Sequence, residues 1–331
     1  MEKIVSLKDD FGTILITGGT GSLSKAIIKR LREYHKIDYN KIIIYSRDEA
    51  KQIIFDGQND IVKVIGDVRD AHKLDLIVKR HKVNTIIHTA ALKRINDLEY
   101  YPDECVETNI IGSRNVAYVA QENEVEKCIL TSTDKACMPV NVYGASKFIA
   151  ERIFTNYAYN SKKTIFGSVR YGNVIASRGS FVPVWYGKIK NDEEIPVTSF
   201  DCTRFLFTLH DAADFVLYAL TQMKGGDIFV PKLNSFRMED ILLSLNQILN
   251  KKEKPKTKLI GMRPGEKFHE DMISEFESRR VEEVGYAHVI IPDYFINEKS
   301  IEIPPVNSQN YINTNKDYLK QLLERGLNET E

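Results

Sequence analysis

The sequence has no excess of charge of either sign, because its 331 residues include 46 Lys plus Arg and 46 Asp plus Glu. It therefore lacks the basic surplus that attracts nucleic acid or a membrane surface, and any bound anion must be held by local groups. No stretch approaches the roughly 18 uninterrupted apolar residues of a membrane-spanning helix, and the first ten residues lack the apolar core of a signal peptide. We expect a cytoplasmic protein without nucleic-acid or membrane partners.

Cysteine is also scarce, and neither cysteine nor histidine shows a metal-ligand pattern. The cysteines are irregularly spaced and form no Cys-x-x-Cys pair, so we expect reduced thiols at Cys105, Cys128, Cys137 and Cys202. The seven histidines are scattered without ligand spacing, and the sequence predicts no metal site. We interpret His88, which ends an expected strand, as a packed or hydrogen-bonded side chain.

Between about residues 12 and 170, short apolar runs alternate with longer amphipathic segments, which is the pattern of parallel strands joined by helices. The expected strands are 13–16, 41–45, 62–65, 85–88, 127–131 and 164–169. The expected helices include 25–34, 71–81 and 112–123. The pattern predicts an α/β fold, a doubly wound parallel sheet of the Rossmann type with a smaller C-terminal substrate-binding region. Its ligand belongs at the carboxyl ends of the strands.

The pattern becomes less regular beyond about residue 175, where glycines and prolines separate short elements. We place a dinucleotide-binding domain at 1–174 and a substrate-binding region at 175–290. An arrangement in which parts of the second region belong to the first domain stays open. Residues 291–331 carry two adjacent prolines, many polar residues and an amphipathic stretch at 318–327. We expect this segment to be a peripheral C-terminal arm.

A glycine-rich loop follows the first expected strand and leads into a helix that is expected to start near Lys25. Glycines keep such a turn tight and let backbone amides approach a pyrophosphate, which sits at the positive end of the helix. The alternative is a plain turn, but the order of strand, loop and helix favours a dinucleotide site. The loop residues expected to bind the cofactor are Thr17, Gly18, Thr20, Gly21, Ser22 and Leu23.

The end of the second expected strand favours NADP as the cofactor. An NAD enzyme usually presents an acidic residue there to the ribose 2′-hydroxyl, whereas Ser46 and Arg47 offer groups suited to a 2′-phosphate. The alternative is a solvated charged turn in which Asp48 lies close to the position typical of NAD enzymes. Further cofactor contacts are expected after the third and fourth strands, at Asp67, Val68, Ala90 and Ala91.

Residues 132–147 place several proton-handling groups just beyond the expected strand 127–131. Tyr143 and Lys147 stand four apart and share one helix face, so a lysine ammonium there is expected to lower the pKa of the tyrosine from about 10. A tyrosine tuned in this way can act as a base. The run Thr133-Asp134-Lys135 adds a hydroxyl, an acid and an amine, although Asp134 and Lys135 alone are also compatible with a solvated ion pair.

These motifs resemble the extended short-chain dehydrogenase/reductase superfamily, through the glycine loop, Ala90-Ala91-Leu92-Lys93, Asn109 and Tyr143-x-x-x-Lys147. Between about residues 12 and 285, the chain more narrowly resembles the UDP-N-acetylglucosamine 4,6-dehydratases that invert carbon 5. The motifs that carry this likeness are 46–49, 132–136 and 263–267. Related dehydratases that retain configuration typically have glutamate in place of Lys135, so this lysine distinguishes the inverting group. One departure is Ser24, where the family commonly has glycine; we expect slightly altered packing there.

The resemblance implies an NADP-dependent lyase acting on UDP-N-acetylglucosamine or a close UDP-hexosamine. Tyr143 is expected to take the proton of the 4-hydroxyl, with Thr133 hydrogen-bonded to that oxygen, while a hydride passes to the nicotinamide. Lys135, with its pKa lowered by burial, then removes the C5 proton. Asp134, kept protonated, donates to the departing 6-hydroxyl, and the hydride returns to carbon 6. With Lys147, these residues are the expected catalytic set.

The resemblance also implies further binding residues and an assembly. The expected substrate-binding residues are Lys93, Asn173, Arg204, Arg263 and Glu266, and the cofactor set also includes Lys51, Lys93, Tyr143 and Lys147. A structural role is the alternative for each arginine. Family members form dimers or larger rings, so a homo-oligomer is expected. Two other functions stay open, a UDP-sugar 4-epimerase of the same superfamily and a catalytically inactive nucleotide-sensing relative.

Overall fold

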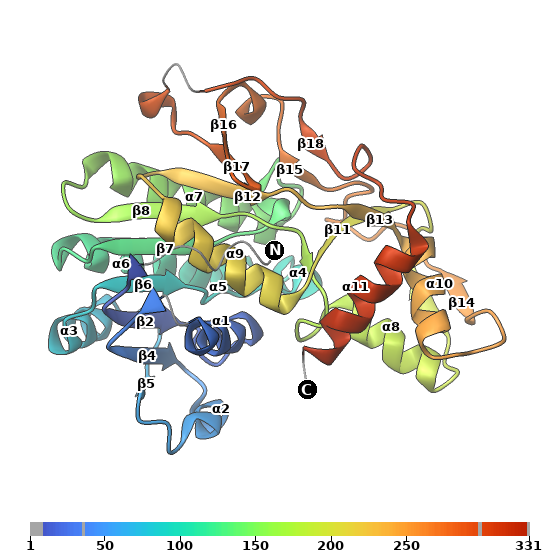
Figure 1. Cartoon of the computed structure of the whole chain (residues 1–331), viewed down its shortest axis with the longest axis horizontal. Helices are drawn as coiled ribbons and strands as arrows, with labels where there is room; N and C mark the ends of the chain where they lie inside the picture. Colours follow the sequence, from blue (N-terminus) through green and yellow to red (C-terminus); the bar gives the residue numbers. More distant parts are fainter. Residues whose placement is uncertain (1–8, 35–36, 297–299, 330–331) are drawn as a thin grey trace.

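A nine-stranded sheet forms the centre of the protein in the computed structural model, which describes residues 9–34, 37–296 and 300–329. The spatial order of its strands is β16-β17-β12-β8-β7-β6-β2-β4-β5 (Figure 1). Their bounds are β2 (Thr13–Thr17), β4 (Lys41–Ser46), β5 (Ile61–Ile65), β6 (Thr85–His88), β7 (Lys127–Thr131), β8 (Ile165–Val169), β12 (Asp227–Pro231), β16 (Val281–Val284) and β17 (Ala287–Ile290). The strands from β5 to β12 pair in parallel, and β17 and β16 extend the β12 edge in antiparallel fashion.

The direction of winding reverses between β2 and β6, because the chain builds from β2 outward to β5 and then returns to β6 on the other side. This confirms the predicted doubly wound, Rossmann-type sheet, and all six expected strands are present. A ligand of such a sheet binds beside the reversal, at the carboxyl ends of the strands.

Helices cover both faces of the sheet (Figure 1). Strand β2 shows why, because alternate side chains point to opposite faces and both faces are apolar. Ile14 and Ile16 pack with α1 (Ser22–Glu33) and α9 (Leu209–Gln222), whereas Leu15 packs with helices on the other face. Those helices are α3 (Ala71–His81), α6 (Gly112–Glu122) and α7 (Val142–Asn160).

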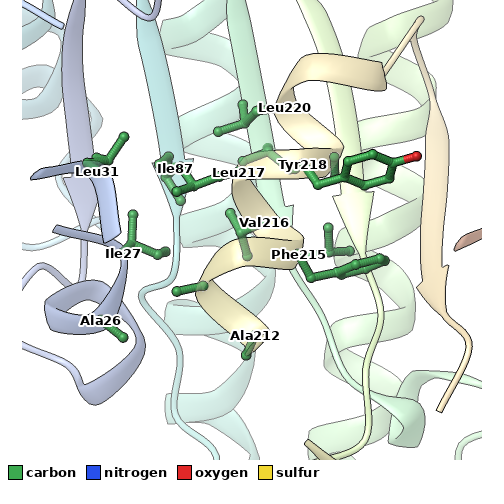
Figure 2. Close-up of a cluster of buried hydrophobic side chains, with 14 of the residues drawn as sticks. Ala26, Ile27, Leu31, Ile87, Ala212, Phe215, Val216, Leu217, Tyr218 and Leu220 are labelled. Atoms are coloured by element: carbon green, nitrogen blue, oxygen red, sulfur yellow. The ribbon is translucent and has the colours of Figure 1, made fainter. Parts of the chain in front are cut away.

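The packing of α9 against α1 buries branched aliphatic side chains over the middle of the sheet. Figure 2 shows Leu217 of α9 beside Ile87 of β6, with Ile27 and Leu31 of α1 close by. All four side chains are almost wholly buried. This layer holds α1, and therefore the glycine loop before it, against the sheet.

A second apolar cluster lies beside the sheet, around α8 (Phe181–Lys190), α10 (Met238–Ile248) and α11 (Lys316–Asn328), which Figure 1 shows grouped together. Three short sheets also lie in the second half of the described chain. They are β9 (Asn173–Val174) with β11 (Thr203–Phe207) and β13 (Ser235–Arg237), β10 (Ile195–Val197) with β14 (Thr257–Leu259), and β15 (Asp271–Ile273) with β18 (Val306–Asn307). Because β12, β16 and β17 belong to the main sheet, that sheet extends beyond residue 174. The domain boundaries themselves stay a prediction.

The remaining elements are short. They are β1 (Asp9–Asp10), β3 (Ile37–Asp38), α2 (Glu49–Gln52), η2 (Ile53–Phe55), α4 (Ile95–Leu98), α5 (Pro102–Cys105), the π-helical turn η3 (Val106–Ile111), η4 (Asp134–Ala136), η5 (Glu277–Arg279) and η6 (Asp293–Phe295). Within the described parts of the chain, no helix has the length and apolar character needed to cross a membrane.

Candidate active site

The glycine loop forms a tight turn between β2 and α1. Gly18 adopts a left-handed conformation with φ of 67°, and a Cβ there would lie 2.9 Å from the backbone of Ala90. Helix α1 begins at Ser22, three residues earlier than expected, and Gly21 at its N-cap supplies no side-chain cap. The first amides of α1 are therefore available to an anion.

Ser24 affects the glycine loop through its hydrogen bonds as well as through the size of its side chain. Its side chain is fully buried, and its hydroxyl donates to the carbonyl of Gly18 at 3.0 Å. It also lies 2.8 Å from the hydroxyl of Thr89, just beyond β6. The serine therefore ties the loop to the end of the neighbouring strand through contacts that a glycine cannot make.

A chain of buried hydrogen bonds runs from the glycine loop toward α7. His88 Nδ1 lies 2.6 Å from the hydroxyl of Thr17, and His88 Nε2 lies 3.0 Å from the hydroxyl of Ser113. Since Ser113 donates to the carbonyl of Asn109, His88 must donate from Nε2 and accept from Thr17 at Nδ1. Burial lowers the pKa of His88 to about 3, so the ring is neutral. The expectation of a hydrogen-bonded histidine is confirmed.

Asn109 continues this chain from the π-helical turn. Its side chain bonds both the amide and the carbonyl of Leu92, and it donates to the hydroxyl of Ser146 at 2.9 Å. Ser146 in turn donates to the carbonyl of Tyr143. The loop after β6 and the start of α7 are thus held in one arrangement.

The residues expected to select the cofactor lie at the ends of β4 and β5. Ser46 is buried and its hydroxyl accepts from Gln52 at 3.0 Å, whereas the Arg47 side chain is 51% exposed and lies 3.7 Å from Asp67. Asp48 caps α2 and forms an ion pair with Lys51. The carboxylate that would suit NAD therefore already has a cationic partner.

Thr133, Asp134 and Lys135 follow β7 and form a buried cluster. Asp134 is 0% exposed, and its Oδ1 accepts from the Thr133 hydroxyl at 2.9 Å and from Lys135 Nζ at 2.9 Å. Its Oδ2 is buried and has no partner among the described residues. Burial favours a lower pKa for Lys135, but Asp134 and Glu270 outweigh it and raise the pKa. The condition stated for Lys135, a pKa lowered by burial, is therefore not met, because the adjacent Asp134 and the distant Glu270 together outweigh burial.

Tyr143 lies near the start of α7, where it contacts this cluster. Burial raises its pKa to about 12, while Lys135 and a hydrogen bond with Thr133 act in the opposite direction. The expected lowering by Lys147 is wrong, because burial dominates and the cation that acts on the tyrosine is Lys135. Lys147 is 2% exposed, and burial lowers its own pKa to about 8. The fold thus brings the two halves of segment 132–147 together.

The 263–267 motif packs against this segment. The Asn141 side chain caps α7 and also donates to the carbonyl of Gly265 at 2.7 Å. Lys267 donates to the carbonyl of Cys137 at 2.7 Å. Arg263 is exposed, and Glu266 accepts from the Thr198 hydroxyl at 3.1 Å and the Arg263 amide at 3.4 Å. Both side chains are at least partly accessible beside segment 132–147.

The other expected substrate residues differ in how their polar groups are used. Arg204 donates to the carbonyls of Thr203, Lys267 and Phe268, so much of its guanidinium holds backbone in place. Asn173 Oδ1 is buried without a partner among the described residues, which leaves an acceptor available.

Lys93 lies after β6 in a partly enclosed position. Burial lowers its pKa, and the nearby Arg178 lowers it further. A partly enclosed lysine beside a second cation favours an anionic ligand. Arg178 also lowers the pKa of Asp48, so it lies near both Lys93 and Asp48. The sequence analysis missed Arg178.

Glu270 is a second residue that the sequence analysis missed. It is 2% exposed, and its Oε1 lies 3.4 Å from Lys135 Nζ and 3.9 Å from Arg204 Nε. Its sequence position, three residues after the 263–267 motif, was the one available signal. In the described ranges, the protein has no cluster of three or more His, Cys, Asp or Glu residues that could hold a metal ion.

Comparisons with known proteins show the family to which the chain belongs. The chain matches the family model described as polysaccharide biosynthesis protein over residues 14–292. It is 44% identical over 286 residues to the UDP-N-acetylglucosamine 4,6-dehydratase (inverting) of Campylobacter jejuni subsp. jejuni serotype O:23/36 (strain 81-176), covering 84% of this chain and 82% of that protein. It is 39% identical over 327 residues to the UDP-glucose 4-epimerase of Rickettsia bellii (strain OSU 85-389), covering 94% of this chain and 95% of that protein.

The X-ray structure of Pen from Bacillus thuringiensis has a similar fold, with a TM-score of 0.87 and 32% identity. The match covers 96% of this chain and 100% of that one. The chain therefore belongs to the polysaccharide biosynthesis protein family, within the extended short-chain dehydrogenase/reductase superfamily.

Proposed function

We propose that the protein is an NADP-dependent UDP-N-acetylglucosamine 4,6-dehydratase that inverts carbon 5 and forms a UDP-4-keto-6-deoxy-N-acetylhexosamine. The observation that carries the proposal is the buried pair of Asp134 and Lys135, whose charges both act on Tyr143. Oxidation of an alcohol needs one base, whereas elimination of water also needs an acid and a second base. The 44% identical dehydratase of C. jejuni supports the substrate.

A nicotinamide dinucleotide fits the glycine loop, because Gly18 lets Ala90 approach and the start of α1 has no side-chain cap. When bound, this cofactor would accept a hydride from carbon 4 and return it to carbon 6. The half-exposed Arg47 supports NADP, since the acidic alternative, Asp48, is engaged by Lys51.

Tyr143 and its neighbours would move the first proton. The phenol, with its pKa of about 12, is protonated at neutral pH, so it must give up its own proton before it takes the proton of the 4-hydroxyl. Lys135 and the hydroxyl of Thr133 favour the phenolate. Lys147, on the same helix face and with a pKa of about 8, is present in part as the amine that would accept the phenol proton.

Asp134 and Lys135 would carry out the elimination. A proton moves from Lys135 Nζ to Asp134 Oδ1 across 2.9 Å, which leaves an amine and a carboxylic acid. The amine removes the C5 proton, which the 4-ketone has acidified, and the acid protonates the 6-hydroxyl, which leaves as water. Both groups then return to the ammonium and carboxylate. A solvent proton then adds to carbon 5 from the opposite face, which completes the proposed inversion, and Tyr143 releases the proton of the 4-hydroxyl to solvent.

A UDP-sugar 4-epimerase is the second candidate, favoured by the 39% identical relative from R. bellii. It would use Tyr143 and the cofactor without the acid and base pair. An inactive nucleotide-sensing relative is disfavoured by the presence of Tyr143 and Lys147. By resemblance, we also propose a cytoplasmic homo-oligomer.

The test is to incubate the protein with NADP and UDP-N-acetylglucosamine in deuterium oxide and follow the sugar by NMR. The expected product has a methyl group at carbon 6, deuterium at carbon 5 and an inverted carbon 5. The inversion is read from the couplings among the remaining ring protons, because deuterium replaces the C5 proton. An intact hydroxymethyl group with a changed carbon 4 would instead identify an epimerase, and an unchanged sugar would refute both activities. Lys135→Ala should bind NADP but lose exchange at carbon 5. The control is Lys163→Ala, which removes a lysine that is 64% exposed.

A further inference from the structure

Glu270 is a buried acid whose carboxylate forms ion pairs with two cations, Lys135 and Arg204. Its backbone is held at both ends by Ser308, which accepts from the Glu270 amide at 2.8 Å and donates its own amide to the Glu270 carbonyl at 2.8 Å. Its carboxylate instead faces Lys135 and Arg204, at 3.4 and 3.9 Å. The other oxygen, Oε2, is buried and has no partner among the described residues. The charge of Glu270 therefore acts mainly on these two cations.

Lys135 is consequently held between two carboxylates from distant parts of the chain. Asp134 approaches it from η4, and Glu270 approaches it from the segment before β15. The other charged or titratable groups that act here are Arg204 from β11 and Tyr143 from α7. Two acids thus balance the two cations, and the loss of either acid leaves an excess positive charge in a buried place.

We propose that Glu270 is a positioning residue that fixes the Lys135 ammonium and sets the pH range in which this lysine can act as a base. The catalytic part of this inference rests on the proposed function. Asp134 cannot set this range alone, because it exchanges a proton with Lys135 during the proposed elimination. Glu270 takes no part in that exchange, so its charge favours return of the proton to Lys135 after each turnover.

The direct test measures the titration of Lys135 in the full chain. Acetic anhydride labels neutral amines, and mass spectrometry of the peptide that contains Lys135 gives its reactivity at each pH. Removal of one opposite charge at this distance is expected to shift the titration of Lys135 in Glu270→Gln to lower pH by about one unit or more. The matched control is Glu193→Gln, because Glu193 also lies 3.4 Å from a lysine, Lys188, but is 52% exposed. This control should leave Lys135 unchanged.

The second arm measures the pH profile of deuterium exchange at carbon 5. The proposed elimination needs the proton that Lys135 passes to Asp134, so loss of this proton to solvent sets the falling limb of the profile. This limb should move to lower pH in Glu270→Gln, in the same direction as the labelling curve. If the wild-type protein does not dehydrate the sugar, the proposed function fails, yet the labelling arm still tests the placement of Glu270. If the wild type dehydrates but Lys135 titrates identically in Glu270→Gln, the inference alone fails.

Glu270→Asp keeps the experiment decisive if Glu270→Gln does not fold. This substitution preserves the charge but withdraws it from Lys135 by one methylene group. A smaller shift in the same direction supports the proposal. An unchanged titration in a folded Glu270→Asp variant, with Glu270→Gln unfolded, assigns Glu270 a purely structural role and overturns it.

Discussion

Replacement of Glu277 by glutamine should destabilise the protein strongly, because it breaks a buried ion-pair cluster. Arg170 is fully buried and its guanidinium is bonded to Glu151, Glu277 and the carbonyl of Met272. Glu277 accepts from Arg170 at 2.8 and 2.9 Å, and also from the amide and hydroxyl of Ser274. In either orientation, a glutamine amide would set one donor against another.

The magnitude follows from two independent arguments. Burial alone would raise the pKa of Glu277, but the charge of Arg170 and the hydrogen bonds to Arg170 and Ser274 outweigh burial and lower the pKa from 4.5 to about 2. This shift corresponds to about 3 kcal/mol of stabilisation at neutral pH. Removal of one partner from a buried ion pair costs about 3 to 5 kcal/mol. We therefore expect the free energy of unfolding to fall by about 3 to 5 kcal/mol at about pH 7.

The pH dependence distinguishes this charge from a packing effect. A depressed carboxyl pKa contributes stability that is fully present above about pH 4.5 and is lost as the pH falls toward about 2. The difference between the wild type and Glu277→Gln should therefore stay constant near neutrality and shrink below about pH 4.5. Urea unfolding, followed by the fluorescence of the single tryptophan, Trp185, measures both quantities.

The control for this experiment is Glu275→Gln. Glu275 lies two positions away, is 75% exposed and pairs with Arg279 at 3.6 Å, so its replacement should change stability by less than about 1 kcal/mol. A Glu277→Gln variant that resembles this control, or a stability difference that does not shrink below about pH 4.5, would refute the reasoning.

Three further substitutions test the cofactor site and the core. Arg47→Ala should weaken NADP binding by roughly tenfold or more and leave NAD binding nearly unchanged, because a charge-assisted bond to the 2′-phosphate contributes about 1.5–3 kcal/mol. Isothermal titration calorimetry with both cofactors measures this, and an equal loss of affinity for NADP and NAD would contradict it. Gly66→Ala should weaken cofactor binding, because its Cβ would lie 2.2 Å from the ring of Tyr45, whose hydroxyl donates to the carbonyl of Asp67. The test compares the dissociation constants for NADP of Gly66→Ala and of the control Gly57→Ala. Gly57 has open space around it, and its positive φ of 75° adds backbone strain but no steric clash. Leu217→Ala should leave a cavity in the core and lower the free energy of unfolding by about 2–5 kcal/mol, without altering the pH profile of activity. Urea unfolding measures this, and a decrease of less than about 1 kcal/mol would contradict the prediction.

The elements that the sequence predicted well are those encoded by neighbouring residues. The strands of the first half appear as short apolar runs because both of their faces are buried, and the glycine loop appears because its turn needs residues without side chains. Helix α1 starts three residues before the predicted position, because Gly21 provides no capping side chain that would mark the start in the sequence. The position of Tyr143 and Lys147 on one helix likewise follows from local spacing.

Local patterns of residues were thus enough to predict the fold class and to find the reactive groups after β7. The protonation of those groups depends on the folded chain, because a pKa depends on burial and on charges that sequence spacing does not reveal. Glu270, which raises the pKa of Lys135, comes from a segment more than 100 residues away, and it is held in place by Ser308 near the C-terminus. Burial likewise reversed the direction expected for Tyr143. The residue types were local information, but the electrostatics of the site came from the long-range packing of the chain.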